Sequence, residues 1–330
     1  WNIHETQEGI FDFDGNKDVE CFVRLAGELG LHVILRPSPF ICAEWEFVGL
    51  PAWLLRYEDM KVRSNTPLFL SKVDSYYKEL FGHIAGLQIT QGGPVIMMQV
   101  ENEYGSFGND KEYLRAIKRL MEENGAQVPL FTSDGAWDAA LEAGSLIEDG
   151  VLATANFGSR SGENLDVLEA FFRRNGRRWP LMCMEFWDGW FNRWKEKIIT
   201  RDPADLAMEV AELLKRASIN LYMFQGGTNF GFYNGCSARG YTDLPQITSY
   251  NYDALMTEWG EPTAKFYQVQ QVVRKRFPHL KTMEPRDRKR KAYGQDVPFA
   301  DNPAAIFAVT RDARYKMNTV LSFFLLAIYM

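Results

Sequence analysis

Cysteine and histidine are scarce in this sequence and follow no regular spacing. Its 330 residues include four of each, with no CxxC pair and no HExxH or HxH motif, so nothing indicates a metal centre. We therefore expect neither a metal nor a cofactor. We expect the thiols to be free and buried, which favours a cytoplasmic over a secreted protein. The cysteines are Cys21, Cys42, Cys183 and Cys236.

Basic charge and long apolar runs are also lacking. The net charge of −6 implies no basic face, which argues against nucleic acid as a partner. The apolar run at 320–330 is too short to span a bilayer. Because the chain opens on Trp1, we expect a fragment whose true N-terminus is absent. Aromatic residues reach 14%, which excludes disorder and suits a neutral sugar ligand.

What the sequence does contain is a regular alternation of apolar and amphipathic segments. The apolar runs are nearly continuous, as in parallel strands that are buried on both faces. The predicted strands are 32–40, 94–103, 128–134, 151–157, 181–187 and 220–228. The predicted helices are 17–29, 66–86, 110–124, 162–175, 203–217 and 263–276.

This alternation predicts an α/β fold, a (β/α)8 TIM barrel that lacks its first strand and ends in a short irregular tail. Residues 1–5 are interpreted as the end of a further strand. A doubly wound sheet is the alternative, but no GxGxxG follows the first strand. We expect an incomplete catalytic domain over 1–280, followed by a linker and tail over 281–330.

The carboxyl ends of the predicted strands carry acidic and aromatic side chains. In a parallel barrel these ends form the active site. One strand runs into Glu44, another ends at Glu101 and Glu103, and a third ends at Glu185. Because side chains alternate along a strand, Glu101 and Glu103 are expected to face the same way. If they face the barrel interior, Glu101 lies one layer deeper, and we expect it to have a structural role.

A pair of carboxylates among aromatic rings is typical of glycoside hydrolysis. One carboxyl donates a proton to the leaving oxygen while the other attacks or assists at the sugar carbon. Glu103 and Glu185 are the candidates, since a carboxylate that follows an apolar run is costly to bury without a purpose. The aromatic rings of Trp45, Trp187 and Trp190 are candidates to pack against the sugar.

Five segments closely resemble glycoside hydrolase family 35, the β-galactosidases, in the order and spacing of that family. The resemblance extends over about residues 1–275. The segments are RPSPFICAEWEFVGLPAWLL (36–55), GGPVIMMQVENEYGSFG (92–108), MEFWDGWFNRW (184–194), MFQGGTNFGFYNG (223–235) and ITSYNYDALMTEWGE (247–261).

The resemblance implies a retaining exo-β-galactosidase that acts on terminal galactose of an oligosaccharide or glycoconjugate. It implies that Glu103 is the acid/base and Glu185 the nucleophile. The galactose-binding positions that it implies are Cys42, Ala43, Glu44, Asn102 and Tyr252. Two positions depart from the family pattern RPGPY, which here has Ser38 and Phe40.

Other functions stay open at this point. Because the first strand and a galactose-contacting tyrosine upstream are absent, we expect this chain alone to fold poorly or to be inactive. It would then be a galactoside-binding barrel without catalysis. A metal-dependent or nicotinamide-dependent barrel enzyme is the remaining alternative. The sequence leaves the linkage, the leaving group and the oligomeric state undetermined.

Overall fold

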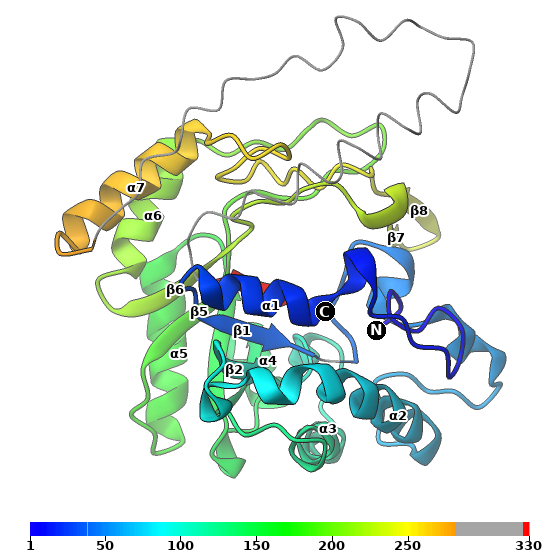
Figure 1. Cartoon of the computed structure of the whole chain (residues 1–330). Coiled ribbons are helices and arrows are strands. Elements are labelled where there is room, and N and C mark those ends of the chain that lie inside the picture. Colours follow the sequence, from blue (N-terminus) through cyan, green and yellow to red (C-terminus); the bar gives the residue numbers. More distant parts are fainter. Residues whose placement is uncertain (38, 281–325, 330) are drawn as a thin grey trace, which may run out of the picture.

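Six parallel strands, consecutive along the chain, form the centre of the molecule (Figure 1). The computed structural model describes residues 1–37, 39–280 and 326–329. The strands are β1 (Val33–Arg36), β2 (Val95–Gln99), β3 (Leu130–Gly135), β4 (Leu152–Phe157), β5 (Leu181–Trp187) and β6 (Ala217–Tyr222). They lie side by side in sequence order, without the reversal that defines a doubly wound sheet. The barrel prediction is confirmed, in the form of a curled half-barrel.

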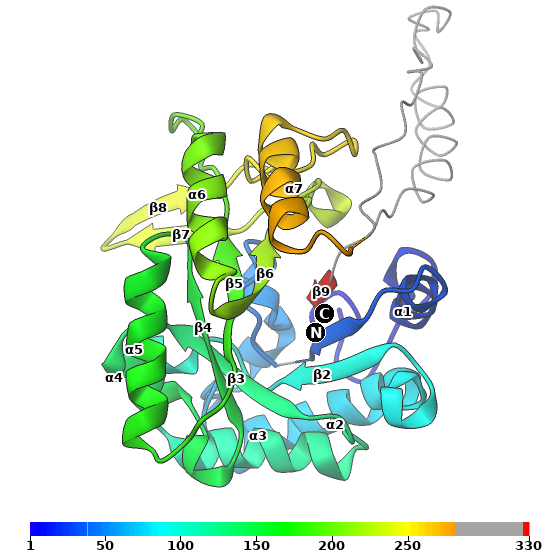
Figure 2. The same ribbon diagram turned by 90° about the vertical axis from the view of Figure 1, so that its left-hand side faces the viewer.

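Helices connect the strands and lie outside the sheet (Figure 2). They are α1 (Val19–Glu28), α2 (Pro67–Ile84), α3 (Lys111–Glu123), α4 (Asp138–Gly144), α5 (Ser161–Arg174), α6 (Pro203–Leu213) and α7 (Ala264–Arg276). Helix α3 illustrates how the local sequence specifies where a helix begins and which face it buries. The Asp110 carboxylate accepts hydrogen bonds from the Glu112 and Tyr113 amides and so caps the helix, which buries Tyr113, Ile117 and Met121. All six predicted helices are present, and α4 is additional.

The core lies on both faces of the sheet. In β5 every residue from Leu181 to Phe186 is buried, as expected of a parallel strand that is covered on two sides. One large cluster packs α1, α2 and α3 against β1 and β2, and a second packs α5, α6 and α7 against β4 and β5. The strand ends are thereby held in fixed relative positions.

Residues 1–5 are not the end of a strand, contrary to the prediction. The backbone N–H groups of His4 and Glu5 both donate to the Trp1 carbonyl, which closes a turn. The Trp1 ring is buried and stacks on Tyr76 with ring centroids 5.2 Å apart. Residues 1–5 therefore form a turn that packs against α2 and pairs with no strand.

The predicted irregular tail contains one short strand. Strand β9 (Leu326–Tyr329) pairs in parallel with β1 from Val33 to Arg36 and lies at one edge of the sheet. The rest of the predicted linker and tail, 281–325 and 330, lies outside the described residues. A separate hairpin pairs β7 (Cys236–Arg239) with β8 (Thr242–Pro245).

The cysteine prediction is half right. All four thiols are free, but only Cys183 is buried, while Cys21, Cys42 and Cys236 are exposed. Within the described residues, no helix combines the length and the apolar character needed to cross a membrane.

Candidate active site

A pocket of about 610 Å³ opens at the carboxyl ends of the strands. The structure brings every predicted site residue to this one pocket, together with the three predicted sugar-facing tryptophans. Those ten lining residues are Cys42, Ala43, Glu44, Trp45, Asn102, Glu103, Glu185, Trp187, Trp190 and Tyr252. Positions more than 200 residues apart in the sequence therefore meet at one site.

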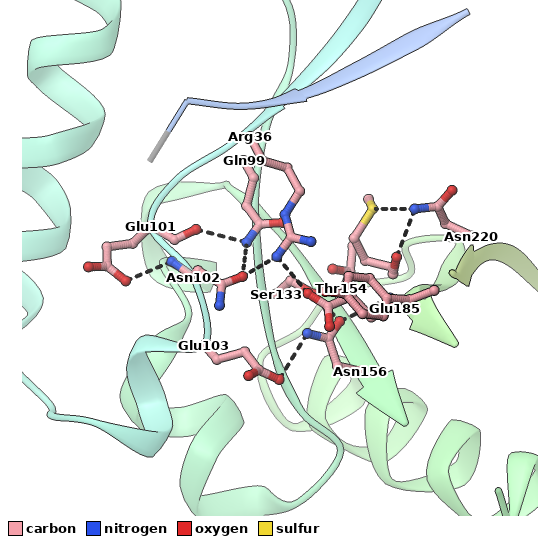
Figure 3. Close-up of polar contacts among 12 residues, drawn as sticks. Arg36, Gln99, Glu101, Asn102, Glu103, Ser133, Thr154, Asn156, Glu185 and Asn220 are labelled. Atoms are coloured by element: carbon pink, nitrogen blue, oxygen red, sulfur yellow. Dashed lines mark hydrogen bonds and ion pairs between the residues drawn. The ribbon is translucent and has the colours of Figure 1, made fainter. Parts of the chain in front are cut away.

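The chain turns sharply after β2, so that Glu101 and Glu103 do not share a direction. Both residues have a left-handed backbone, with φ of 58° and 46°, and the alternation of an extended strand ends there. Glu101 points away from the pocket (Figure 3). The prediction that Glu101 occupies a deeper layer of the barrel interior is wrong, because β2 ends at Gln99.

Glu101 instead anchors the turn from outside the pocket. Arg63 donates to both of its carboxylate oxygens, at 3.0 and 2.7 Å, and the Tyr113 hydroxyl donates to one of them at 2.9 Å. Arg63 also donates to the Asn102 carbonyl at 2.7 Å. The structural role expected for Glu101 is consistent with these contacts, which fix the segment that carries Asn102 and Glu103.

Asn156, at the end of β4, connects the carboxylate of Glu103 to the backbone of Glu185 (Figure 3). Its Oδ1 accepts from the Ser133 hydroxyl at 2.6 Å and from the Glu185 amide at 3.1 Å. These two donors identify the oxygen, so the other side-chain atom is Nδ2, which donates to Glu103 Oε1 at 3.0 Å. One amide therefore sets the position of Glu103 relative to Glu185.

Glu103 has the electrostatics of a proton donor. Burial raises its pKa to about 6, and the charge of Glu185 contributes in the same direction, while the hydrogen bond from Asn156 opposes the shift. A carboxyl group with a pKa near 6 is partly protonated close to neutral pH, so it can donate a proton and then take one back.

Glu185, near the end of β5, is surrounded by donors. Arg36 Nη2 lies 2.6 Å from Oε1, and Trp187 Nε1 donates to Oε2 at 3.0 Å. The Arg36 side chain is almost completely buried, so its charge acts on Glu185 with little screening by water. These contacts stabilise the negative charge of a carboxylate and hold it in place.

Hydrogen bonds from Gln99 and Arg36 orient the Asn102 side chain. Its Oδ1 accepts from Gln99 Nε2 at 3.1 Å and also from Arg36 Nη2. Because the oxygen is used in this way, Nδ2 is the group that remains to donate to a ligand beside Glu103. Arg36 therefore contacts both the nucleophile candidate and the amide next to the acid candidate.

Glu44 lies at another wall of the pocket and is bound by Tyr250. The Tyr250 hydroxyl donates to Glu44 Oε2 at 2.7 Å and lies 2.9 Å from the Tyr222 hydroxyl. Burial raises the pKa of Glu44 to about 7, against the effect of this hydrogen bond. Near neutral pH the Glu44 carboxyl group can therefore accept a hydrogen bond from a ligand hydroxyl group when it is ionised and donate one when it is protonated.

Tyr252 belongs to a cluster of aromatic rings that closes the pocket beside Glu44. Its ring stacks on Tyr250 with centroids 5.4 Å apart, and Tyr222 meets it edge to face at 5.2 Å. Trp190 packs at 6.4 Å on Tyr252. The rings give the pocket a stiff apolar wall, which suits the C–H face of a sugar ring.

Cys42 and Ala43 lie in the loop after β1. Cys42 is exposed and has a φ of 55°, so the expectation of a buried thiol is wrong here. The Ala43 amide donates to the Val48 carbonyl at 3.3 Å, which leaves the Ala43 carbonyl as its polar group toward a ligand. The loop is held from across the pocket, since Asn229 and Gly235 both donate to the Glu44 carbonyl.

Sequence reasoning missed four residues that organise this site: Arg36, Asn156, Tyr222 and Tyr250. Arg36 left a signal, because an arginine directly after the apolar run Val33–Leu35 has to find a buried partner. Asn156 left a weaker one of the same kind in the run 151–157. The two tyrosines lay in aromatic segments where packing alone would have explained them.

The described part of the chain holds no group of three or more His, Cys, Asp or Glu side chains arranged to bind a metal ion. The chemistry that can be read from the pocket is that of two carboxyl groups in different environments, which is acid–base and nucleophilic chemistry at one substrate.

Comparison with other sequences finds relatives whose names include beta-galactosidase. The chain is 43% identical over 271 residues to beta-galactosidase-1-like protein 2 of Homo sapiens, covering 82% of this chain and 41% of that protein. It is 43% identical over 280 residues to the beta-galactosidase of Homo sapiens, covering 83% and 40%. The chain thus spans about two fifths of the length of these relatives.

Solved structures of low sequence identity share the fold. The structure of GH5_18 from Streptomyces cattleya in complex with GlcNAc superposes with a TM-score of 0.56 at 14% identity, over 87% of this chain and 71% of that one. A beta-galactosidase from Rahnella sp. R3 superposes with a TM-score of 0.53 at 13% identity, over 82% and 49%. These similarities concern the barrel only.

The chain also matches the profile of a protein family over most of its length. Residues 1–276 match the profile described as glycosyl hydrolases family 35. That match includes both carboxyl groups, the loop of Glu44 and the aromatic wall of the pocket. The chain belongs to glycosyl hydrolase family 35.

Proposed function

We propose that this chain is the catalytic barrel of a retaining, exo-acting β-galactosidase. The observation that carries the proposal is the pair of dissimilar carboxyl groups on one pocket. Glu185 is held by two donors, and Glu103 has a pKa raised to about 6. Such a separation of environments distinguishes a nucleophile from a proton donor.

In the first step, a carboxylate oxygen of Glu185 attacks the anomeric carbon of galactose. The bond between that carbon and the glycosidic oxygen breaks, and Glu103 gives its proton to the departing oxygen. In the second step, Glu103 takes a proton from water, the water oxygen bonds to the anomeric carbon, and the bond to Glu185 breaks. The two displacements together retain the β configuration.

The remaining pocket residues are assigned to the sugar. Asn102 Nδ2 is available to hold the 2-hydroxyl, whose hydrogen bonds strengthen in the transition state. Glu44, fixed by Tyr250 at 2.7 Å, serves hydroxyl groups on the opposite side of the ring. Backbone groups of Cys42 and Ala43 lie on the same side, and Tyr252 contributes to the wall beneath the sugar.

The decisive experiment is proton NMR of the sugar first released from an aryl β-galactoside. We expect β-galactose to appear first and to convert to the α anomer by mutarotation. Initial release of α-galactose would exclude a retaining mechanism. Binding of galactose without any release would support the galactoside-binding barrel instead.

The nucleophile has a separate test. Glu185→Gly should abolish turnover, and added azide or formate should restore part of it by taking the place of the missing carboxylate. The same anions should not restore a Glu103→Gly variant with a sugar leaving group, because they cannot supply the proton. Absence of rescue at Glu185 would contradict its assignment as the nucleophile.

A further inference from the structure

A second pocket borders the first one. It has a volume of about 560 Å³ and lies beyond the ends of β3, β4 and β5. Trp187 and Trp190 line both pockets, and Asn156, which donates to Glu103 in the first pocket, lines the second one. The second pocket therefore begins at the side chain that holds Glu103, and Glu44 and Tyr250 belong to the first pocket alone.

The position of Glu103 indicates which part of the substrate would lie in each pocket. A proton donor has to reach the oxygen between the two sugars, so the bond that breaks lies beside Glu103 and Asn156. Galactose extends from that point toward Glu44. The leaving group then extends the other way, over Asn156 and Trp187. We infer that the second pocket binds the leaving-group sugar, with Trp137 as its aromatic platform; this inference rests on the proposed function.

Trp137 is presented to solvent on a rigid support. Its side chain is 52% exposed, although its ring lies directly against Gly135 at the end of β3. A Cβ at Gly135 would lie only 1.8 Å from the ring, so the close approach requires glycine there. A flat indole face held in this way costs little entropy when a sugar ring packs on it.

The floor of the second pocket is equally well fixed. Gly158 approaches Trp187 so closely that a Cβ would lie 2.5 Å from the Trp187 carbonyl oxygen. Arg201 Nη1 donates to the carbonyl oxygens of Gly158 and Trp187 at 2.6 and 3.0 Å. The loops after β4 and β5 are thereby held together, and Trp187 has a fixed place between the two pockets.

Each arginine that lines the second pocket has a carboxylate partner. Arg201 Nε donates to Asp205 at 2.8 Å, and Arg160 lies 3.7 Å from Glu163. The other polar side chains that line it include Ser159 and Asn164, which are uncharged. An aromatic platform with neutral polar groups suits an uncharged pyranose as the leaving group.

Binding measurements can test this inference in a Glu103→Gln background, where hydrolysis is slow and the amide resembles the protonated acid. Calorimetry would compare galactose with β-1,3-, β-1,4- and β-1,6-linked galactosyl-glucose. We expect at least one disaccharide to bind about tenfold more tightly than galactose. Adding Trp137→Ala should remove most of that advantage and leave the affinity for galactose within about twofold.

The matched control is Trp194→Ala, a tryptophan that is 65% exposed and lines neither pocket. It should change neither affinity, and Trp137→Phe should retain part of the advantage. The inference is overturned if no disaccharide binds more tightly than galactose, if Trp137→Ala behaves like Trp194→Ala, or if it weakens galactose as much as the disaccharide. Failure of galactose itself to bind would instead reject the proposed function, and this inference with it.

Discussion

Asn156 controls the protonation of Glu103 through one hydrogen bond. Its Nδ2 donates to the ionised carboxylate at 3.0 Å and so lowers the pKa of Glu103 relative to burial alone. Asn156→Ala removes this donor. The pKa of Glu103 should then rise above about 6, and because the protonated acid is required, activity should persist to higher pH.

The measurement is kcat/KM as a function of pH, whose alkaline limb reports the acid in the free enzyme. We expect the limb to move upward in Asn156→Ala while the rate at its maximum falls, since Glu103 is also less well positioned. Ser133→Ala is the control, because it disturbs Asn156 from the Oδ1 side and leaves the donor in place. A limb that stays fixed or moves downward would contradict the role given to Asn156.

Glu103→Gln should affect substrates according to their leaving groups. A sugar leaving group needs the proton, so kcat/KM should fall by about 10²–10⁴-fold. An aryl leaving group such as dinitrophenolate departs without a proton, so the rate of its first step should change far less. Steady-state kinetics on both substrates measure the contrast, and equal losses on the two would argue against Glu103 as the acid.

At the level of single elements, the turn after β2 depends on an ion pair outside the pocket. The Arg63 and Glu101 side chains are 6% and 1% exposed, and Arg63 also packs on the Phe40 ring at 3.7 Å. Arg63→Met leaves a buried carboxylate without its cation, which typically costs about 3–5 kcal/mol of unfolding free energy. Because Arg63 also holds the Asn102 carbonyl, kcat should fall as well.

Chemical denaturation would measure that loss, with Arg119→Met as the control in an exposed pair, where the expected change is below about 1 kcal/mol. The double variant Arg63→Met with Glu101→Leu should regain much of the stability, since an apolar pair of similar size avoids the buried charge. If Arg63→Met is no more harmful than Arg119→Met, Glu101 does not anchor the turn.

The elements themselves were predictable where burial acts on the sequence directly. A run such as Leu181–Met184 has to be apolar because both faces of the sheet are covered. Helix α4 was missed because its seven residues, DAALEAG, are too few to establish a period. The directions of Glu101 and Glu103 were missed because a left-handed backbone at each residue is a tertiary outcome that no strand pattern reveals.

The candidate site was predictable as a set of positions but not as a network. Strand ends and family resemblance gave Glu44, Glu103 and Glu185, since a barrel collects such ends at one rim. The contacts that tune these carboxyl groups join residues as distant as Arg36 and Glu185, or Glu44 and Tyr250. Those pairs follow from side-chain packing across the whole barrel, and local sequence does not encode them.

At the scale of the whole molecule, the last helix of the barrel is fastened to the site by one buried lysine. Lys265 on α7 donates to the carbonyl oxygens of Asp188 and Asp253 at 2.7 and 2.6 Å, and contacts the Asp253 carboxylate at 2.5 Å. It thereby joins the loop after β5 to the turn that carries Tyr252. The two segments touch directly, since the Trp190 amide donates to the Tyr252 carbonyl at 3.1 Å.

Lys265→Met should therefore loosen the pocket from a distance. The side chain keeps its length, but two carbonyl oxygens and the 28% exposed Asp253 carboxylate lose their donor, at a cost of about 1–3 kcal/mol. Because Trp190 and Tyr252 then move relative to each other, KM for a galactoside should rise several-fold while the pH dependence set by Glu103 stays unchanged. Thermal denaturation and steady-state kinetics measure the two effects. Lys275→Met, on an exposed position of the same helix, is the control and should leave both stability and KM unaltered. If Lys265→Met lowers stability without any change in KM, α7 supports the barrel but does not position the site.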